Sequence, residues 1–344
     1  IIFDNEIADN NQREIAIDMS YTIFFDKIVQ IISNIPIRYS NSGAMLLPNM
    51  YTFLEMYDVG LIEQLNILER WKRNDSTISL KAPIGIDISG MPIVLDIHEK
   101  AHGPHGLIAG STGSGKSEFI ITYILSLAVN YHPDDVSFLL IDYKGGGLAG
   151  AFQKNDIKLP HLVGKITNID TNGLQRSLAS IQSELRRRQI IFDKARNMID
   201  EGVMDIYKYQ KLYHDGVLKI PIPHLLIICD EFAELKQQQE EFMEGLISVS
   251  RIGRSLGVHL ILATQKPAGI VDDQIRSNSK FAICLKVQDT EDSNDVIKRP
   301  DAASLRGAGQ FFMQVGNDDY FVLGQSAWAG AQYYPSSIIK KKTD

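Results

Sequence analysis

The sequence predicts an α/β fold in which a mostly parallel, twisted sheet is flanked by helices. Two observations lead to this class. From residue 106 onward, short apolar runs alternate with longer helical stretches, which is typical of strands buried on both faces of a parallel sheet. In addition, a glycine-rich turn joins the first of these runs to a helix-like segment, and phosphate-binding α/β proteins place such a turn at this junction.

The chain is expected to contain one main domain and two flanking segments. Residues 1–80 should form a smaller α+β segment, residues 81–335 the main domain, and residues 336–344 a linker stub. Because the chain begins with Ile and shows no signal peptide, we expect it to be a piece of a longer protein.

Ahead of the main sheet, the sequence predicts one helix and one hairpin. Apolar residues spaced three and four apart predict a single amphipathic helix over residues 61–71. These residues are Leu61, Leu65, Leu68 and Trp71. Residues 85–97 form two apolar runs around Gly90, which predicts a β-hairpin that turns at this glycine. We expect the N-terminal region to pack on the domain that follows.

Within the main domain, five strands and one long helix stand out. The strands are expected at residues 106–110, 137–143, 224–231, 258–265 and 281–287. The helix is expected at residues 174–195, where Glu184 and Arg188 form a favourable pair one turn apart. Its apolar face consists of Leu174, Leu178, Ile181, Leu185, Phe192 and Ala195.

The composition is that of a soluble globular protein. Of the 344 residues, 44% are apolar and 22% are charged, and the formal net charge is −7. This balance argues weakly against a chain whose main task is to grip nucleic-acid phosphates. Cys229 and Cys284 both lie inside apolar runs, so we expect two buried, reduced thiols and a cytosolic setting.

The glycine-rich turn, GSTGSGKS at residues 110–117, matches the phosphate-binding pattern G-x-x-x-x-G-K-[ST] in full. Gly113 and Gly115 let successive backbone N–H groups point at a phosphate chain, and the following helix adds its positive dipole end. Lys116 is expected to reach the β- and γ-phosphates of ATP, and Ser117 to ligate Mg²⁺. An accidental turn is the alternative, but one with these flanking elements is rare. The predicted phosphate-binding residues are Gly110, Ser111, Thr112, Gly113, Ser114, Gly115, Lys116 and Ser117.

A second apolar run, HLLIICDE, ends in two carboxylates. Ligands of open α/β sheets bind at the carboxyl ends of the strands. We therefore expect Asp230 to hold the Mg²⁺ shell and Glu231 to polarise the attacking water. Taken alone, two exposed acids at a strand end would be the simpler interpretation. The complete phosphate-binding motif favours the functional one.

Further polar residues follow the next strand and precede it. Gln265, after Thr264, could sense the γ-phosphate, although a pair that merely caps the strand before a proline is a rival interpretation. Arg254 is the candidate for a cation that one subunit supplies to its neighbour's γ-phosphate. Surface arginines are usually only solvated. Arg276 and Lys280 are weaker candidates for the same task.

Asp142 and Lys144 lie at the end of another predicted strand and precede three glycines. A loop at this edge of the sheet is suited to couple the nucleotide state to a moving partner. An ordinary flexible loop is the alternative.

Several of these segments together resemble a known family. AGSTGSGKSE, LLIDYKGGG, LPHLVGKITN, SELRRRQ, CDEFAEL and RSLGVHLILATQKP resemble the translocase ATPases of the FtsK/SpoIIIE type, which are RecA-like P-loop motors. LDIHEKAHGPHGLIAGSTGSGKSE and GQSAWAGAQYY look more specifically like the type VII secretion ATPases of the EssC/EccC type, and best fit the first of their tandem ATPase modules.

The resemblance implies a set of partners and roles. It implies an ATPase that acts as a ring, with a hexamer expected, next to neighbouring ATPase modules and membrane components of a secretion machine. Its exported cargo would be small helical WXG-type proteins, and the parent protein would be anchored at the cytoplasmic face of the bacterial membrane. In the family's motifs Gln265 matches the sensor and Arg254 the trans-acting arginine. DNA-moving relatives tend to carry an arginine just before the last predicted strand, where this chain has Lys280 and Ala282.

Three functions therefore compete. The first is a protein-export ATPase that uses ATP and Mg²⁺, and the type-specific motifs and acidic charge favour it over DNA as a partner. The second is a DNA translocase of the same fold, which would need basic pore loops and salt-sensitive binding. The third is a module that binds ATP in order to assemble and hardly turns it over, against which the intact Glu231 speaks.

Overall fold

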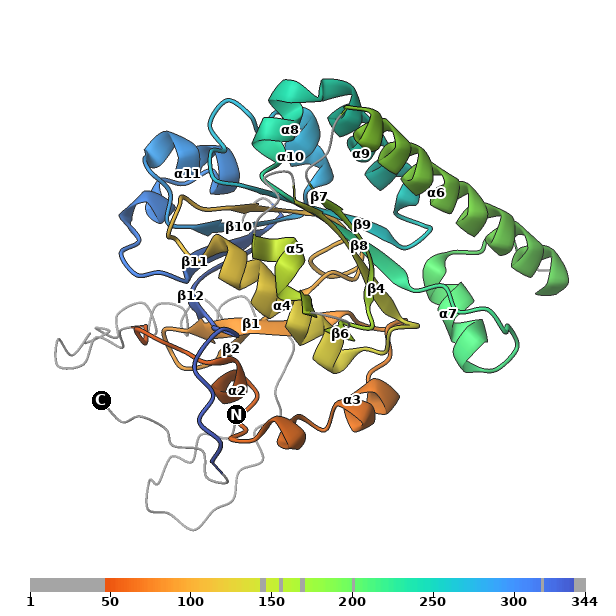
Figure 1. Cartoon of the computed structure of the whole chain (residues 1–344), viewed down its shortest axis with the longest axis horizontal. Coiled ribbons are helices and arrows are strands. Elements are labelled where there is room, and N and C mark those ends of the chain that lie inside the picture. The colour runs from red at the N-terminus through yellow and green to blue at the C-terminus, as the bar shows by residue number, and fades with distance from the viewer. Residues whose placement is uncertain are drawn as a thin grey trace, which may run out of the picture. The chain divides into compact units, whose positions relative to one another are not determined.

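The computed structural model describes residues 47–142, 147–154, 157–167, 171–199, 202–316 and 319–336. All of them belong to the compact unit Met45–Asp344, which is distinct from the unit Ile1–Ala44. In the described residues the centre is a ten-stranded sheet with the order β2-β1-β12-β11-β10-β3-β9-β8-β4-β7. Helices cover this sheet on both faces (Figure 1), so the predicted α/β class is confirmed.

The parallel part of the sheet carries the five predicted strands. They are β3 (Gly106–Ala109), β4 (Val136–Asp142), β8 (His224–Asp230), β9 (Val258–Thr264) and β10 (Phe281–Leu285). Strand β7 (Leu162–Thr167), which the sequence analysis missed, pairs in parallel with β4 at the sheet edge. It was missed because its burial alternates and its apolar run is short.

An antiparallel part extends the sheet beyond β10. It contains β1 (Lys81–Asp87), β2 (Pro92–Asp96), β11 (Gln310–Val315) and β12 (Tyr320–Ser326). Strands β1 and β2 pair antiparallel, and Gly90 between them adopts a φ of +78°, so the predicted hairpin is confirmed. The pairing of β1 with β12 joins the two ends of the domain sequence, and no local pattern predicted this contact. A separate two-stranded ribbon pairs β5 (Gln153–Lys154) with β6 (Ile157–Lys158).

The predicted long helix is α6 (Thr171–Ile199), and its apolar face packs into the core as expected, with Leu178 partly buried. Arg188 Nε donates to Glu184 Oε1 at 2.9 Å, and the Arg188 side chain is only 2% exposed. The other helices are α2 (Phe53–Met56), α3 (Ile67–Arg73), α4 (Lys116–Asn130), α5 (Gly147–Ala151), α7 (Ile206–His214), α8 (Phe232–Gln238), α9 (Glu240–Gly253), α10 (Asp273–Asn278), α11 (Thr290–Ile297) and the 3₁₀ helices η1 (Ile62–Leu65) and η2 (Asp301–Ser304).

The single helix predicted for residues 61–71 is wrong. The chain instead forms η1 and then α3, and Asn66 between them adopts the left-handed conformation with a φ of +48°. Asparagine tolerates this conformation better than most residues. The break turns Leu68 outward, to 67% exposure, whereas Trp71 donates its indole N–H to the Ala128 carbonyl of α4. Residues 61–71 still contact the domain through Trp71, whereas residues 1–46 lie outside the described part of the chain.

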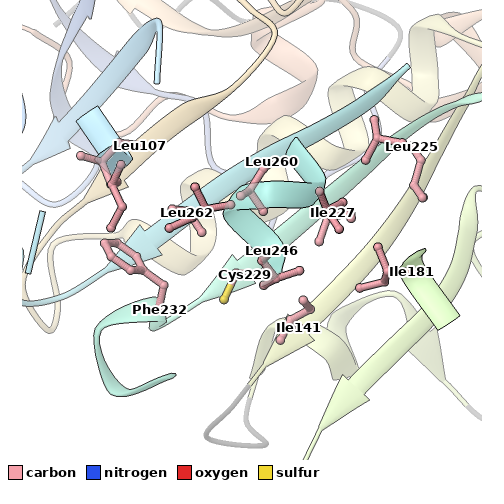
Figure 2. Packing of buried hydrophobic residues seen from close by; sticks show 14 of the residues in the cluster. Leu107, Ile141, Ile181, Leu225, Ile227, Cys229, Phe232, Leu246, Leu260 and Leu262 are labelled. Carbon is pink, nitrogen blue, oxygen red and sulfur yellow. The ribbon is translucent and has the colours of Figure 1, made fainter. Parts of the chain in front are cut away.

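Two hydrophobic cores lie on opposite faces of the sheet. Along β8, Leu225, Ile227 and Cys229 belong to the core beneath α6 and α9, which Figure 2 shows from close by. The intervening Leu226 and Ile228 belong to the core with α4. Because successive side chains of a strand point to opposite faces, a continuous apolar run serves both cores. Cys229 and Cys284 are free and fully buried, and burial raises the pKa of both thiols.

Within the described part of the chain, no helix combines the length and the apolar character needed to cross a membrane.

Candidate functional site

Polar residues meet where four parallel strands end. Ala109 of β3 is paired with Thr264 of β9, and Asp230 of β8 is paired with Ala263 of β9. Asp142 of β4 lies opposite Asp230. These pairings bring the carboxyl ends of the four strands to the same level, so the groups that follow them can act together.

The glycine-rich turn follows β3 and leads directly into α4. Gly113 and Gly115 adopt φ angles of +79° and +94°, which are accessible to glycine at little cost. A Cβ at Gly115 would also lie 2.9 Å from the backbone N of Gly309. The turn is fixed to the strands on either side. The Gly110 N–H donates to the Thr264 carbonyl at 3.1 Å, and the Ser111 N–H donates to the Lys286 carbonyl at 2.8 Å.

Lys116, the first residue of α4, points back across this edge and forms an ion pair with Asp230. The side chains are 4% and 16% exposed, respectively. A lysine is seldom buried unless it is paired. The structure thus brings together the lysine of the turn and the first carboxylate of β8, two residues that the sequence analysis assigned to one site, although it did not predict their ion pair.

Glu231 is held by the end of β9. Its backbone is left-handed, with a φ of +60°, which costs about 1 kcal/mol for a residue with a Cβ. Thr264 Oγ1 donates to Glu231 Oε1 at 2.9 Å, and the Gln265 backbone N–H donates to the same oxygen at 3.2 Å. An uncommon conformation that the surroundings enforce is frequent at functional sites.

Gln265 also contacts the glycine-rich turn. Its side-chain Oε1 accepts a hydrogen bond of 2.8 Å from Thr112 Oγ1. One continuous set of contacts therefore runs from the turn, through Gln265, to the carboxylate of Glu231. The alternative, in which Thr264 and Gln265 only cap the strand, does not account for the contact with Thr112.

The residues present fit a triphosphate and a magnesium ion. The left-handed glycines shape the turn, and Ser117 is exposed beside the buried Lys116. Among the described residues, no three His, Cys, Asp or Glu side chains gather to hold a metal by themselves. Mg²⁺ suits such a site, because it is commonly bound through one or two protein oxygens together with phosphates and water.

Arg254 lies near the amino ends of the parallel strands, opposite the carboxyl ends that carry the candidate site. It follows α9 and precedes the amino end of β9, so the length of the seven-residue strand separates it from Gln265 by about 20 Å. Its side chain is 58% exposed, and its Nε donates to Glu99 Oε2 at 3.1 Å. The structure therefore does not bring Arg254 together with Lys116 in one chain.

The weaker cation candidates are engaged with their own chain. Arg276 Nη2 donates to the Asp295 carbonyl at 2.7 Å. Lys280 Nζ donates to the Ala101 carbonyl at 2.6 Å. Asp142 is 3% exposed and ends β4 opposite Asp230, at the same level of the sheet. Lys144 lies outside the described residues.

Buried histidines lie at the amino ends of the parallel strands, opposite the candidate site. His224 Nδ1 lies 2.8 Å from His259 Nε2, and His105 Nδ1 accepts a hydrogen bond of 3.0 Å from the Leu260 N–H. Burial lowers the pKa of His259 to about 3. Burial, followed by the nearby charge of Arg254, lowers the pKa of His105 to about 4. Burial also lowers the pKa of His224 well below its usual value, so all three rings are neutral at pH 7.

The sequence analysis missed the residues that support the site from a distance in the chain. Glu99 holds Arg254, and Thr264 orients Glu231. Trp328 donates its indole N–H to Glu118, the residue after Ser117. Only the resemblance drew attention to the segment around Trp328, and it gave that residue no role.

The chain is similar in sequence to known proteins. The FtsK/SpoIIIE family model matches residues 65–269. The type VII secretion system protein EssC of Staphylococcus aureus strain Mu50 is 54% identical over 287 residues, which cover 83% of this chain and 19% of that protein. The ESX secretion system protein YukB of Bacillus subtilis strain 168 is 52% identical over 289 residues, with the same coverage of 83% and 19%. The chain thus spans about a fifth of the length of these curated relatives.

Solved structures agree on the fold. The cytoplasmic domain of the Thermomonospora curvata type VII secretion ATPase EccC superposes with a TM-score of 0.72 at 30% identity, over 81% of this chain and 32% of that one. The pCW3 conjugation coupling protein TcpA superposes with a TM-score of 0.61 at 19% identity, over 83% of this chain and 72% of that one. At that identity the second likeness concerns the fold alone. Since the family match covers more than half of the 344 residues, the chain belongs to the FtsK/SpoIIIE family, whose members are P-loop ATPases.

Proposed function

We propose that this chain is an ATP-hydrolysing motor module of a type VII protein secretion system. The contact path from Thr112 through Gln265 to Glu231 carries the hydrolytic part of the proposal, because it links the phosphate-binding turn to a carboxylate. The relatives EssC and YukB, at 54% and 52% identity, support the secretion part. Within the proposal, residues 81–335 are the ATPase domain, residues 1–80 are an N-terminal packing segment or linker region, and residues 336–344 are a linker stub.

In this mechanism, the turn at residues 110–117 binds the phosphate chain of ATP through its backbone N–H groups and the amino end of α4. Lys116 would neutralise the β- and γ-phosphates. Ser117 and Asp230 would hold Mg²⁺, which when bound offsets charge on the phosphate oxygens.

Glu231 would accept the proton of the attacking water. Thr264 and the Gln265 amide fix its carboxylate, so little reorganisation is needed when the proton moves. Gln265, bonded to Thr112, would report whether the γ-phosphate is in place.

A complete site needs a second copy of the chain. Arg254 is about 20 Å from its own Gln265, and its exposed guanidinium can extend towards a neighbour. We propose that copies assemble into a ring, with six subunits expected, in which Arg254 of one subunit approaches the γ-phosphate bound by the next. The whole protein would work at the cytoplasmic face of the bacterial membrane, beside further ATPase modules, and export small helical proteins.

The test is ATP turnover as a function of protein concentration, for the wild type and for Lys116→Ala. We expect low activity per subunit in dilute solution, a rise as copies associate, and background activity for the variant at every concentration. A specific activity independent of concentration would contradict the shared site.

Duplex DNA at low and high salt provides the second arm of this experiment. We expect no stimulation by DNA, because the net charge of −7 offers little attraction to phosphates. Strong, salt-sensitive stimulation would instead identify a DNA translocase.

A further inference from the structure

The order of the strands sets the direction in which a nucleotide must lie. Gln265 and Glu231 follow β9 and β8, on one side of the P-loop strand β3, and β10 lies on the other side. For hydrolysis, the γ-phosphate has to face Glu231. A triphosphate is a linear chain, so the nucleoside would then leave the turn on the opposite side, towards the first turn of α4 and the loops that follow β10 and β12.

Trp328 lies on that side. Beyond the end of β12, the Ala327 carbonyl accepts a hydrogen bond of 2.7 Å from Thr122 Oγ1 of α4. The next residue, Trp328, donates its indole N–H to Glu118 Oε2 at 3.1 Å. Glu118 directly follows Ser117, so the indole contacts the residue next to the phosphate-binding turn.

Hydrogen bonds of the backbone and of the indole ring hold Trp328 in place. Its backbone N–H donates to the Tyr51 carbonyl at 2.7 Å, and its carbonyl accepts from the Phe53 N–H at 3.2 Å. A Cβ at Gly330 would lie 2.7 Å from the indole nitrogen and 3.2 Å from Glu118 Oε2, so a glycine there leaves room for their hydrogen bond. Trp328 is nevertheless 41% exposed.

We propose that Trp328 is the stacking platform for the base of the bound nucleotide. The inference rests on the proposed ATPase function and adds the group that recognises the nucleoside. A rigid, part-exposed indole beside a phosphate site offers its π face to a base, and such stacking tolerates any base because every base has a π face. Glu118 acts as a positioning residue, since its carboxylate holds the edge of the indole ring.

Calorimetric titration of the full chain with Mg-ATP and with inorganic tripolyphosphate separates the base from the phosphates. We expect Trp328→Ala to weaken Mg-ATP binding about tenfold and to leave the affinity for tripolyphosphate unchanged. Trp328→Phe should retain most of the Mg-ATP affinity, because it keeps an aromatic face. Tyr334→Ala, which removes an aromatic side chain of 72% exposure from the same segment, should bind both ligands like the wild type.

Tryptophan fluorescence gives an independent readout, because the chain has two tryptophans. We expect Mg-ATP to change the emission of the wild type and to leave the emission of Trp328→Phe unchanged. The remaining Trp71 lies at the far end of α4, where its indole N–H bonds to Ala128.

The outcomes separate the two proposals. Wild-type Mg-ATP affinity in Trp328→Ala overturns the platform and leaves the ATPase intact. An equal loss of Mg-ATP and tripolyphosphate binding also overturns it, because the residue would then support the turn and not the base. If the wild type takes up neither ligand, the proposed function fails as well.

Discussion

The two edges of the parallel strands carry different chemistry. At the carboxyl edge, charged and polar side chains bind one another within the chain, as in the pairs of Lys116 with Asp230 and Thr112 with Gln265. At the amino edge, neutral histidines are sealed inside, and Arg254 is exposed next to Glu99. The carboxyl edge thus joins its polar groups to one another, while the amino edge combines a sealed interior with an outward cation.

Removing the carboxylate of Glu231 should reduce turnover most and tests the role of the carboxyl edge. Glu231→Gln keeps the size of the side chain and removes the base, so we expect turnover to fall about 10³-fold with Mg-ATP affinity preserved. Turnover and calorimetric titration of the same preparation check this. Unchanged turnover would show that another group accepts the proton, and Asp142 would then be the first alternative.

Removing Arg254 should reduce turnover less, and it tests whether this residue acts at the nucleotide site of a neighbouring subunit. Arg254→Ala should lower turnover on the order of a hundredfold, as does the loss of one preorganised donor, while its own pocket still binds Mg-ATP. Mixing it with Lys116→Ala should recover turnover, because the intact pocket of one variant can meet the intact arginine of the other.

The control for this mixture is the double variant Lys116→Ala/Arg254→Ala, which should recover nothing when mixed with Arg254→Ala. If Lys116→Ala fails to restore activity as well, Arg254 acts within its own chain or not at all in hydrolysis.

The smallest effect concerns the histidines of the amino edge. The lowered pKa of His105, about 4, means that the unfolded chain binds a proton at higher pH than the folded chain does. Stability is therefore full above about pH 6.5 and falls as the pH drops towards 4, by up to about 1.4 kcal/mol per pH unit for this group. In His105→Asn, urea unfolding should show a shallower decline over this window. An identical decline would assign the loss to other groups.

The sequence predicted those parts of the fold that depend on local pattern. Continuous apolar runs identified β3, β4, β8, β9 and β10 because each serves two cores. Glycine positions identified the P-loop turn and the hairpin at Gly90. A spacing pattern failed at Asn66, where one left-handed residue divides a helix in two. The pairing of β1 with β12 could not be predicted, because it joins residues more than two hundred positions apart.

The residues of the candidate site, too, could be predicted only where a local sequence pattern marked them. Lys116, Asp230, Glu231 and Gln265 could be proposed because each lies next to a recognisable strand or turn, and the structure places them at one edge. Glu99 and Trp328 could not be found this way. They reach Arg254 and Glu118 only through tertiary folding, and a lone glutamate or tryptophan has no signature in the sequence.

The ion pair of Lys116 with Asp230 affects how the loss of activity in a Lys116 variant must be interpreted. Both side chains are poorly solvated, so truncating the lysine leaves an anion stranded without its counter-charge, at a cost of about 2 kcal/mol in folding free energy. We consequently expect Lys116→Ala to be less stable as well as inactive. Neutralising the aspartate in the same chain, as in Lys116→Ala/Asp230→Asn, removes the stranded charge, so the difference in unfolding free energy between the two variants measures the cost of that charge to the fold.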